Sequence, residues 1–305
     1  MSGRRYAIYD VFTDKALAGN PLAIVFDCDG LDQAGMQAIA REFNFSETVF
    51  VEPARNPAHN AAIRIFTPHY EMPFAGHPTV GTAVALANDI GLSHDTATLL
   101  VLEEKIGDVR CAVTSDGAGP GFAEFDLPQL SEPLDAELDE AAIAAALGLG
   151  PHQIGFENHR PSLWSAGVPF VAVPVAGLDV AAAIRFDGPA WAEMAPKRDN
   201  GAVACAYLYC RDTIGHDNAF HARMFVPGPP VYEDPATGSA AAAFSGAIVA
   251  FDQPQDGVHT HWIEQGIEMG RASRIRLEID VANGKTRSAR IGGHAVRVAE
   301  GTLAV

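Results

Sequence analysis

The hexapeptide EMPFAG (Glu71–Gly76) recurs as EDPATG (Glu233–Gly238), so the chain contains the same short element twice. The residues before it recur as well. RIFTP (Arg64–Pro68) precedes the first copy, and RMFVP (Arg223–Pro227) precedes the second. Further upstream, AGNPLAIV, which starts at residue 18, has a counterpart in AGVPFVAV, which starts at residue 166. Three matches in the same order indicate a duplicated domain rather than chance similarity.

The spacing of the repeats sets the domain organisation. The first residues of the three pairs lie 148, 159 and 162 residues apart, whereas the units of a solenoid recur at roughly 20–50 residues. A chain of 305 residues also suits two domains of ordinary size. Proline and acidic residues concentrate at DLPQLSEP (Asp126–Pro133). We therefore predict an N-terminal half at 1–127 and a C-terminal half at 128–305, with the last strand free to return to the first half.

Composition excludes several classes of function. The net charge of −17 argues against a nucleic-acid partner, because phosphates would repel the chain. The N-terminus has no apolar run of signal-peptide length, and GSAAAAFSGAIVAF (Gly238–Phe251) is too short to span a bilayer. The four cysteines show no CxxC spacing. A cytoplasmic protein without membrane or nucleic-acid partners is expected.

Hydrophobic patterning predicts the elements. Short runs rich in Val, Ile, Phe and Tyr alternate with turn residues, which is typical of a largely antiparallel sheet. Asp32–Asn44 has the pattern of an amphipathic helix. Thr79–Gly91 and Ser239–Phe251 follow the two repeated motifs and are apolar almost all round, so each should form a helix that is buried on every side. The predicted fold is α+β: two pseudo-symmetric halves, each a mostly antiparallel, barrel-like sheet around a central buried helix.

The N-termini of these two helices are candidate anion sites. A helix N-terminus offers unpaired N–H groups and a partial positive charge to a carboxylate or phosphate. Gly76 and Gly238 allow a ligand to approach the backbone closely. Two such ends from two halves would hold a small carboxylate-bearing substrate between them. The alternative is a plain turn in which Ser239 caps the second helix.

Reactive side chains accompany these helix ends. His77 follows Gly76, Ser239 holds the equivalent place in the second copy, and Asp234 lies at the start of the second motif. Glu47 enters an apolar run in NFSETVFVEP, where burial would raise the pKa of its carboxyl group and suit it to proton transfer. Taken alone, a carboxylate at such a junction is more often a solvated surface group.

The motifs resemble the phenazine-biosynthesis isomerase (PhzF-like) family over nearly the whole chain. The resemblance rests on GNP near the start, SETVFV, RIFTP, PFAGHPTVGTA, EDPATGSA and EQGIEMGRASRI, in this order. It implies the fold of the related diaminopimelate epimerase, with two pseudo-symmetric halves. In that epimerase a catalytic cysteine precedes the glycine of each repeated motif, but here these positions hold Ala75 and Thr237. Two-thiol racemisation is therefore absent.

The resemblance also implies site residues. It assigns the acid/base carboxylate to Glu47, makes His77, Asp234 and Ser239 assisting or ligand-binding residues, and implies no cofactor, no metal and a homodimer. Substrate contacts are expected from the helix ends at Gly76, Thr237, Gly238 and Ser239. Two other hypotheses remain: an amino-acid epimerase of the same fold with non-cysteine bases, and a non-catalytic small-molecule-binding protein. If the chain is an enzyme, Glu47, His77 and Asp234 should line a single cleft between the halves.

Overall fold

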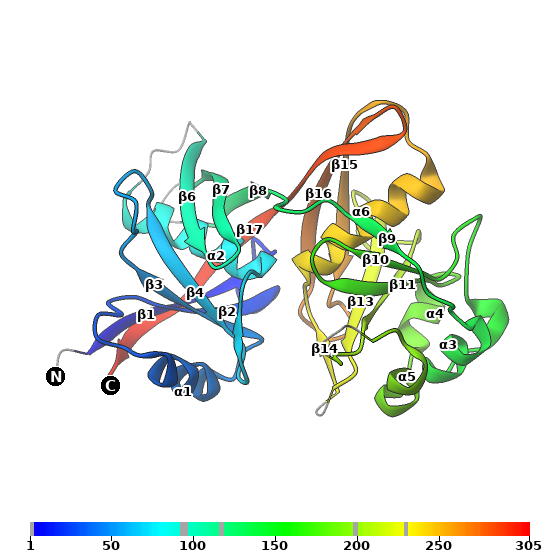
Figure 1. The fold of residues 1–305 in the computed structure, drawn as a ribbon, viewed down its shortest axis with the longest axis horizontal. Helices are drawn as coiled ribbons and strands as arrows, with labels where there is room; N and C mark the ends of the chain where they lie inside the picture. The colour runs from blue at the N-terminus through cyan, green and yellow to red at the C-terminus, as the bar shows by residue number, and fades with distance from the viewer. Residues whose placement is uncertain (1–2, 92–96, 116–118, 198–200, 229–230) are drawn as a thin grey trace. The chain divides into compact units, whose positions relative to one another are not determined.

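The computed structural model describes residues 3–91, 97–115, 119–197, 201–228 and 231–305, and these form two compact units (Figure 1). Unit 1 comprises residues 1–128 together with residues 291–305. Unit 2 comprises residues 129–290. The final strand, β17 (Lys285–Leu303), begins in unit 2 and ends in unit 1. The chain therefore returns to its first unit at its C-terminus.

Unit 1 is a closed β-barrel. Its other elements are β1 (Arg4–Val11), β2 (Asn20–Val25), α1 (Gln33–Phe43), β3 (Glu47–Glu52), β4 (Ala61–Phe66), β5 (Glu71–Met72), α2 (Gly76–Asp89), β6 (Thr98–Glu104), β7 (Gly107–Thr114) and β8 (Gly121–Asp126). The pairings β1–β2–β3–β4–β6–β7–β8–β17–β1 form a ring of eight strands. Among the unit 1 pairs with a described register, only β2–β3 and β4–β6 are parallel. β17 closes the ring between β8 and β1.

Helix α2 fills this barrel. It contacts β1, β2, β3, β6, β7 and β8, and every residue from Gly76 to Ala85 is buried. Small residues make this possible, since a Cβ on Gly81 would lie 2.6 Å from the Leu22 side chain. A helix without a polar face needs apolar neighbours on all sides. The α+β fold with a central buried helix, predicted from the sequence, is confirmed.

Unit 2 surrounds its own helix, α6 (Gly238–Asp252), which contacts β9, β10, β11 and β16. Its strands are β9 (Glu132–Leu134), β10 (Ser162–Ser165), β11 (Pro169–Pro174), β12 (Cys205–Cys210), β13 (Phe220–Val226), β14 (Tyr232–Asp234), β15 (Gly257–Gln265) and β16 (Ser273–Ala282). Short helices complete the unit: α3 (Glu140–Ala146), α4 (Leu178–Ala183), α5 (Gly188–Met194) and a 3₁₀ turn (Pro151–Gln153). Trp191 of α5 is fully buried in the core that these helices cover.

The repeated RxF and ExP motifs form the same ion pair in each unit. In unit 1, the Arg64 guanidinium donates through Nε and Nη2 to both carboxylate oxygens of Glu71, at 2.8 and 3.0 Å. In unit 2, Arg223 makes the same bidentate contact with Glu233, at 2.8 and 2.9 Å. Each pair joins a long strand to the two- or three-residue strand that leads into a central helix. The motif repetition in the sequence therefore corresponds to a repeated structural role.

Helix α1 forms where its pattern predicts. Asp32 caps it by accepting a hydrogen bond from the Gly35 N–H, and Asn44 ends it in the left-handed conformation. Met36, Ile39 and Ala40 are its buried residues.

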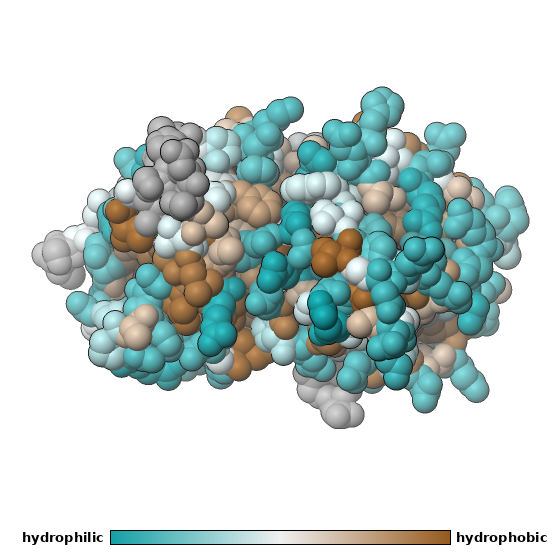
Figure 2. Space-filling model, turned by 90° about the horizontal axis from the view of Figure 1, so that it is seen from above, coloured by the Kyte–Doolittle hydropathy of each residue, from teal (hydrophilic) through white to brown (hydrophobic). Residues whose placement is uncertain are grey.

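The molecular face in Figure 2 is mostly hydrophilic, with hydrophobic residues in small patches, as suits a net charge of −17. No helix within the described ranges is long and apolar enough to cross a membrane.

Candidate active site

Unit 1 brings two predicted site residues into contact. The carboxylate Oε2 of Glu47, the first residue of β3, lies 3.2 Å from Nδ1 of His77 in the first turn of α2. Strand β3 runs parallel to β2, and the register places Glu47 opposite Leu22, one residue after Pro21 of the GNP motif. Only 16 % of the Glu47 side chain is exposed. The alternative of a solvated surface carboxylate is therefore wrong.

His77 is a neutral imidazole. Its side chain is 5 % exposed. Burial lowers its pKa to about 3, although the Pro21 carbonyl acts in the opposite direction. Nε2 of His77 is buried and has no hydrogen-bond partner among the described residues. A neutral ring that contacts Glu47 through one nitrogen leaves the second nitrogen available to a ligand.

Unit 2 gathers the other predicted polar residues. Asp234, at the end of β14, is 6 % exposed and accepts a hydrogen bond from the Thr237 hydroxyl. Gln265, at the end of β15, donates through Nε2 to the Asp234 carbonyl and to Thr237 Oγ1. The glycine after it is required, because Gly266 has φ +74° and a Cβ there would lie 2.5 Å from the Pro235 carbonyl oxygen. Asp234 and Thr237 are thus fixed at the start of α6.

Neither central helix has a side-chain cap. The N-cap residues are Ala75 for α2 and Thr237 for α6, and neither side chain caps its helix by a hydrogen bond. The alternative in which Ser239 caps α6 is wrong, because Ser239 lies inside the first helical turn. Uncapped N-termini that begin with buried glycines, Gly76 and Gly238, suit an anionic ligand.

The predicted site residues thus form one group in each unit. Glu47, Gly76 and His77 belong to unit 1. Asp234, Thr237, Gly238 and Ser239 belong to unit 2, and their convergence on one cleft stays a prediction.

Sequence reasoning missed two buried residues behind these helix ends. In unit 1, the Glu104 carboxyl group contacts the Thr79 hydroxyl at 2.8 Å. In unit 2, Gln265 holds the corresponding position at the end of its strand. The sequence contains only a weak signal, the similarity of LEE (Leu102–Glu104) to IEQ (Ile263–Gln265). The structure shows that both segments end strands that run parallel to the strands bearing Arg64 and Arg223.

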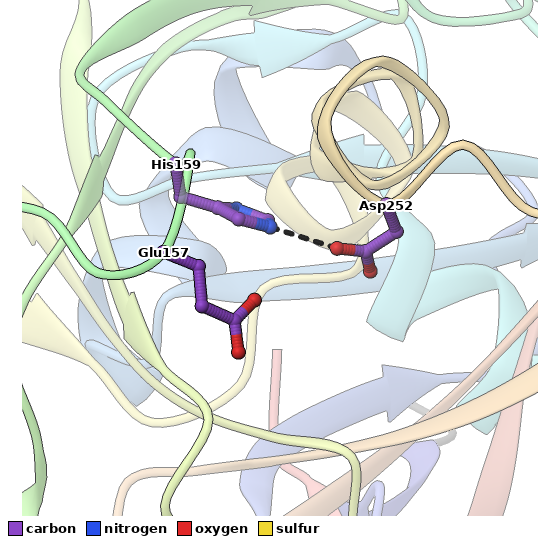
Figure 3. A group of neighbouring side chains, drawn as sticks. All are labelled: Glu157, His159 and Asp252. Atoms are coloured by element: carbon purple, nitrogen blue, oxygen red, sulfur yellow. Dashed lines mark hydrogen bonds and ion pairs between the residues drawn. The ribbon is translucent and has the colours of Figure 1, made fainter.

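A second polar cluster in unit 2 comprises Glu157, His159 and Asp252 (Figure 3). Both ring nitrogens of His159 already have partners, Tyr209 Oη at 2.9 Å and Asp252 Oδ1 at 2.8 Å. The Arg211 guanidinium also bonds to Asp252 and lies 3.5 Å from Glu157. With a fixed cation among the carboxylates, these donors do not suit a metal ion.

Comparison with known proteins identifies the family. The family model described as "Phenazine biosynthesis-like protein" matches residues 9–301. The chain belongs to this phenazine biosynthesis-like (PhzF) family. It is 64 % identical over 304 residues to an uncharacterized isomerase of Mesorhizobium japonicum, with 99 % of each chain covered. It is 32 % identical over 299 residues to the trans-2,3-dihydro-3-hydroxyanthranilate isomerase of Pseudomonas fluorescens, with 98 % of each covered.

Comparison with solved structures supports the same family assignment. A PhzF-family protein of Bacillus anthracis superposes with a TM-score of 0.86 at 27 % identity, covering 100 % of both chains. The PhzF-like chain is therefore an isomerase, and the resemblance stated from its motifs is confirmed.

Proposed function

We propose that this PhzF-like protein is a cofactor-independent isomerase that moves a proton within a small, ring-shaped carboxylate. The proposal rests chiefly on the contact between Glu47 and His77 at the start of α2. A carboxylate positioned by a neutral imidazole, beside an uncapped helix N-terminus, combines a base for a carbon-bound proton with a binding site for an anion. The isomerase of Pseudomonas fluorescens supplies the first substrate to test, trans-2,3-dihydro-3-hydroxyanthranilate.

In this mechanism Glu47 removes a proton from a saturated ring carbon. The electron pair that is released moves into the double-bond system, and the same proton returns at another ring carbon. Atoms and electrons balance without an oxidant or a second reactant. The N-terminal ends of α2 and α6 bind the substrate carboxylate and stabilise the negative charge that develops in the ring. His77 positions Glu47, and Asp234 binds the substrate amino or hydroxyl group.

The test is Glu47→Gln with trans-2,3-dihydro-3-hydroxyanthranilate as substrate. Glutamine keeps the shape of the side chain but cannot accept the proton, so kcat should fall by roughly 10²–10⁴-fold while KM changes little. Glu52→Gln, at the other end of β3, is the matched control and should retain activity. Full turnover by Glu47→Gln would exclude the assigned role.

Turnover in D₂O separates the proposal from epimerisation. Proton transfer within one molecule gives a product with a shifted double bond. An epimerase would instead incorporate solvent deuterium at a stereocentre with inversion, and it would need a second base on the opposite face of the carbon. Absence of turnover with a ligand bound in the site would favour the binding-protein alternative.

A further inference from the structure

Glu104 is a buried carboxyl group that the proposed mechanism does not use. It ends β6, is 3 % exposed, and lies under the first turn of α2, where Thr79 contacts it. Its second oxygen, Oε2, is buried and has no hydrogen-bond partner among the described residues. Burial raises the pKa of Glu104 to about 8, and it does so even against the lowering effect of a hydrogen bond donated by the Thr79 hydroxyl.

Counting hydrogens at Thr79 indicates which form of Glu104 is present. The Thr79 hydroxyl oxygen lies 2.8 Å from the Ala75 carbonyl oxygen and 2.8 Å from Glu104 Oε1. A hydroxyl group has one hydrogen to donate, and a carbonyl oxygen has none. Both contacts can be hydrogen bonds only if one hydrogen comes from Glu104. The arrangement therefore fits a protonated carboxyl group that donates to Thr79, which in turn donates to Ala75.

The internal repeat provides an independent comparison. In unit 1, the Glu103 carboxylate accepts hydrogen bonds from the N–H groups of Arg55 and Asn56. In unit 2, the carboxylate of Glu264 accepts from the N–H groups of Ile214 and Gly215, each 159 residues further along the chain. Glu103 and Glu264 are thus equivalent.

The next residues, Glu104 and Gln265, are then equivalent too. Gln265 lies behind the start of α6 and donates two hydrogen bonds there, to the Asp234 carbonyl and the Thr237 hydroxyl. An amide cannot ionise at neutral pH. The same position behind the two helices thus holds a neutral donor in unit 2 and a carboxyl group in unit 1.

We propose that Glu104 is a positioning residue that stays protonated beneath the anion-binding N-terminus of α2. Loss of its proton then weakens anion binding at this N-terminus. The inference rests on the proposed function of Gly76 and His77. The ionised carboxylate would offset the positive end of the helix dipole and would accept the one hydrogen of the Thr79 hydroxyl, which could then no longer donate to the Ala75 carbonyl. The first turn of α2 would lose this hydrogen bond and much of its attraction for an anion.

Among the described residues, the titratable groups near Glu104 include no cation paired with it. Arg64 of β4 lines a cavity together with Glu104, but its guanidinium is paired with Glu71. Strand β7 contributes the Cys111 thiol, whose pKa is raised by burial and then by Glu104. Helix α2 carries two titratable groups, the neutral His77 and, at its other end, Asp89, which pairs with Arg5. The adjacent Lys105 is 63 % exposed and lies 3.7 Å from Glu71.

The first experiment is the pH profile of kcat/KM for trans-2,3-dihydro-3-hydroxyanthranilate. The wild-type value should fall about tenfold between pH 7 and pH 9, because the group titrates near pH 8. Glu104→Gln, which keeps a neutral donor, should remove this alkaline fall and retain activity at pH 7, whereas Glu104→Ala should lose activity at both values. Glu103→Gln, the same change at the neighbouring residue, should leave the alkaline fall in place.

A second measurement does not depend on turnover. Carbon-13 NMR of protein labelled at the glutamate carboxyl groups should show one carboxyl resonance that titrates near pH 8 and is absent from Glu104→Gln. If the substrate is not converted, the proposed function fails while this titration still decides the state of Glu104. Titration of Glu104 near its ordinary value, or an alkaline fall that persists in Glu104→Gln, would overturn the inference. If Glu104→Gln does not fold, assignment of the resonance in the wild-type protein decides it.

Discussion

At the scale of single residues, His221 of unit 2 is a buried charge that two carboxylates stabilise. Its two ring nitrogens lie 2.9 Å from carboxylate oxygens of Glu264 and Glu268, and its side chain is 1 % exposed. Burial opposes the charged ring, but the hydrogen bonds to these carboxylates outweigh it and raise the pKa of His221 to about 9. The ring is therefore an imidazolium at neutral pH, in contrast to the neutral His77.

Because the pKa of His221 is raised in the folded state, the free energy of unfolding depends on pH. A raised folded-state pKa means that His221 stabilises the fold fully below about pH 6.5, and that this contribution is lost as the pH rises through about 9. His221→Gln leaves the buried carboxylate of Glu264 and the more exposed one of Glu268 without their cation, so it should lower the free energy of unfolding by about 3 kcal/mol at pH 6 and by clearly less at pH 9.5. Urea unfolding at the two pH values measures this.

The exposed His216 provides the control, since His216→Gln should change stability little at either pH. Titration of Glu104 affects the wild type and the His221 variant alike, so it cancels in their difference. If His221→Gln lowered the free energy of unfolding by the same amount at both pH values, the assignment of a charged ring would be contradicted.

The sequence predicted part of the site at this scale. Glu47 and His77 could be selected because each stands in an otherwise apolar segment, where a titratable group needs a reason. Glu104 could not be selected in this way. Its segment, LEEK, has the composition of a solvated strand end, and its burial depends on β6 lying under α2, which involves tertiary contacts that local composition does not contain.

At the scale of elements, the two Arg–Glu pairs allow a matched comparison. Arg223 is 8 % exposed and also donates to the Ala181 carbonyl, whereas Arg64 is 26 % exposed. Arg223→Met should therefore lower the free energy of unfolding by about 3–5 kcal/mol, because it removes the more deeply buried guanidinium with its additional hydrogen bond to Ala181 and leaves Glu233 without it. Arg64→Met should lower it by only about 1 kcal/mol, since Arg64 is more exposed and Lys105, 3.7 Å from Glu71, still offsets the charge of that carboxylate.

Urea unfolding must follow each unit separately, because two units need not unfold in one transition. All three tryptophans, Trp164, Trp191 and Trp262, belong to unit 2, so their fluorescence reports on the Arg223 variant. Hydrogen exchange in β4 and β5 reports on the Arg64 variant. If the two substitutions lower the free energy of unfolding by the same amount, burial of the arginine does not determine the strength of these ion pairs.

The central helices were the most predictable elements. Residues without a polar face can be stable only inside a sheet, and the sequence alone contains that information for α2 and α6. The partners of each strand were less predictable. The parallel pairs β2–β3 and β4–β6 join segments separated by other elements, so their register depends on the assembled barrel.

At the scale of the whole molecule, closure of the unit 1 barrel depends on residues 291–305. β17 pairs with β1 from Arg4 to Val11, and it also pairs with β8. Removing residues 291–305 leaves β1 and β8 with unpaired edges. The truncated chain should lose hydrogen-exchange protection throughout β1–β8 but retain the tryptophan fluorescence of folded unit 2.

Removal of Ala304 and Val305 alone is the control, because both residues follow the end of β17. Full protection of β1–β8 in the longer truncation would mean that the barrel is stable when open. No local pattern marks this strand as the partner of the N-terminus, since its partner lies nearly 300 residues away in sequence.

The position of β17 also orders events during synthesis. Residues 129–290 are complete before residues 291–305 are made, whereas the barrel of unit 1 cannot close until β17 has been synthesised. At about 5–20 residues per second, the nascent first unit waits roughly 10–30 s with two open edges. Unit 1 is thus begun before unit 2 and completed after it, and its unpaired strands stay open to pairing with other chains in that interval.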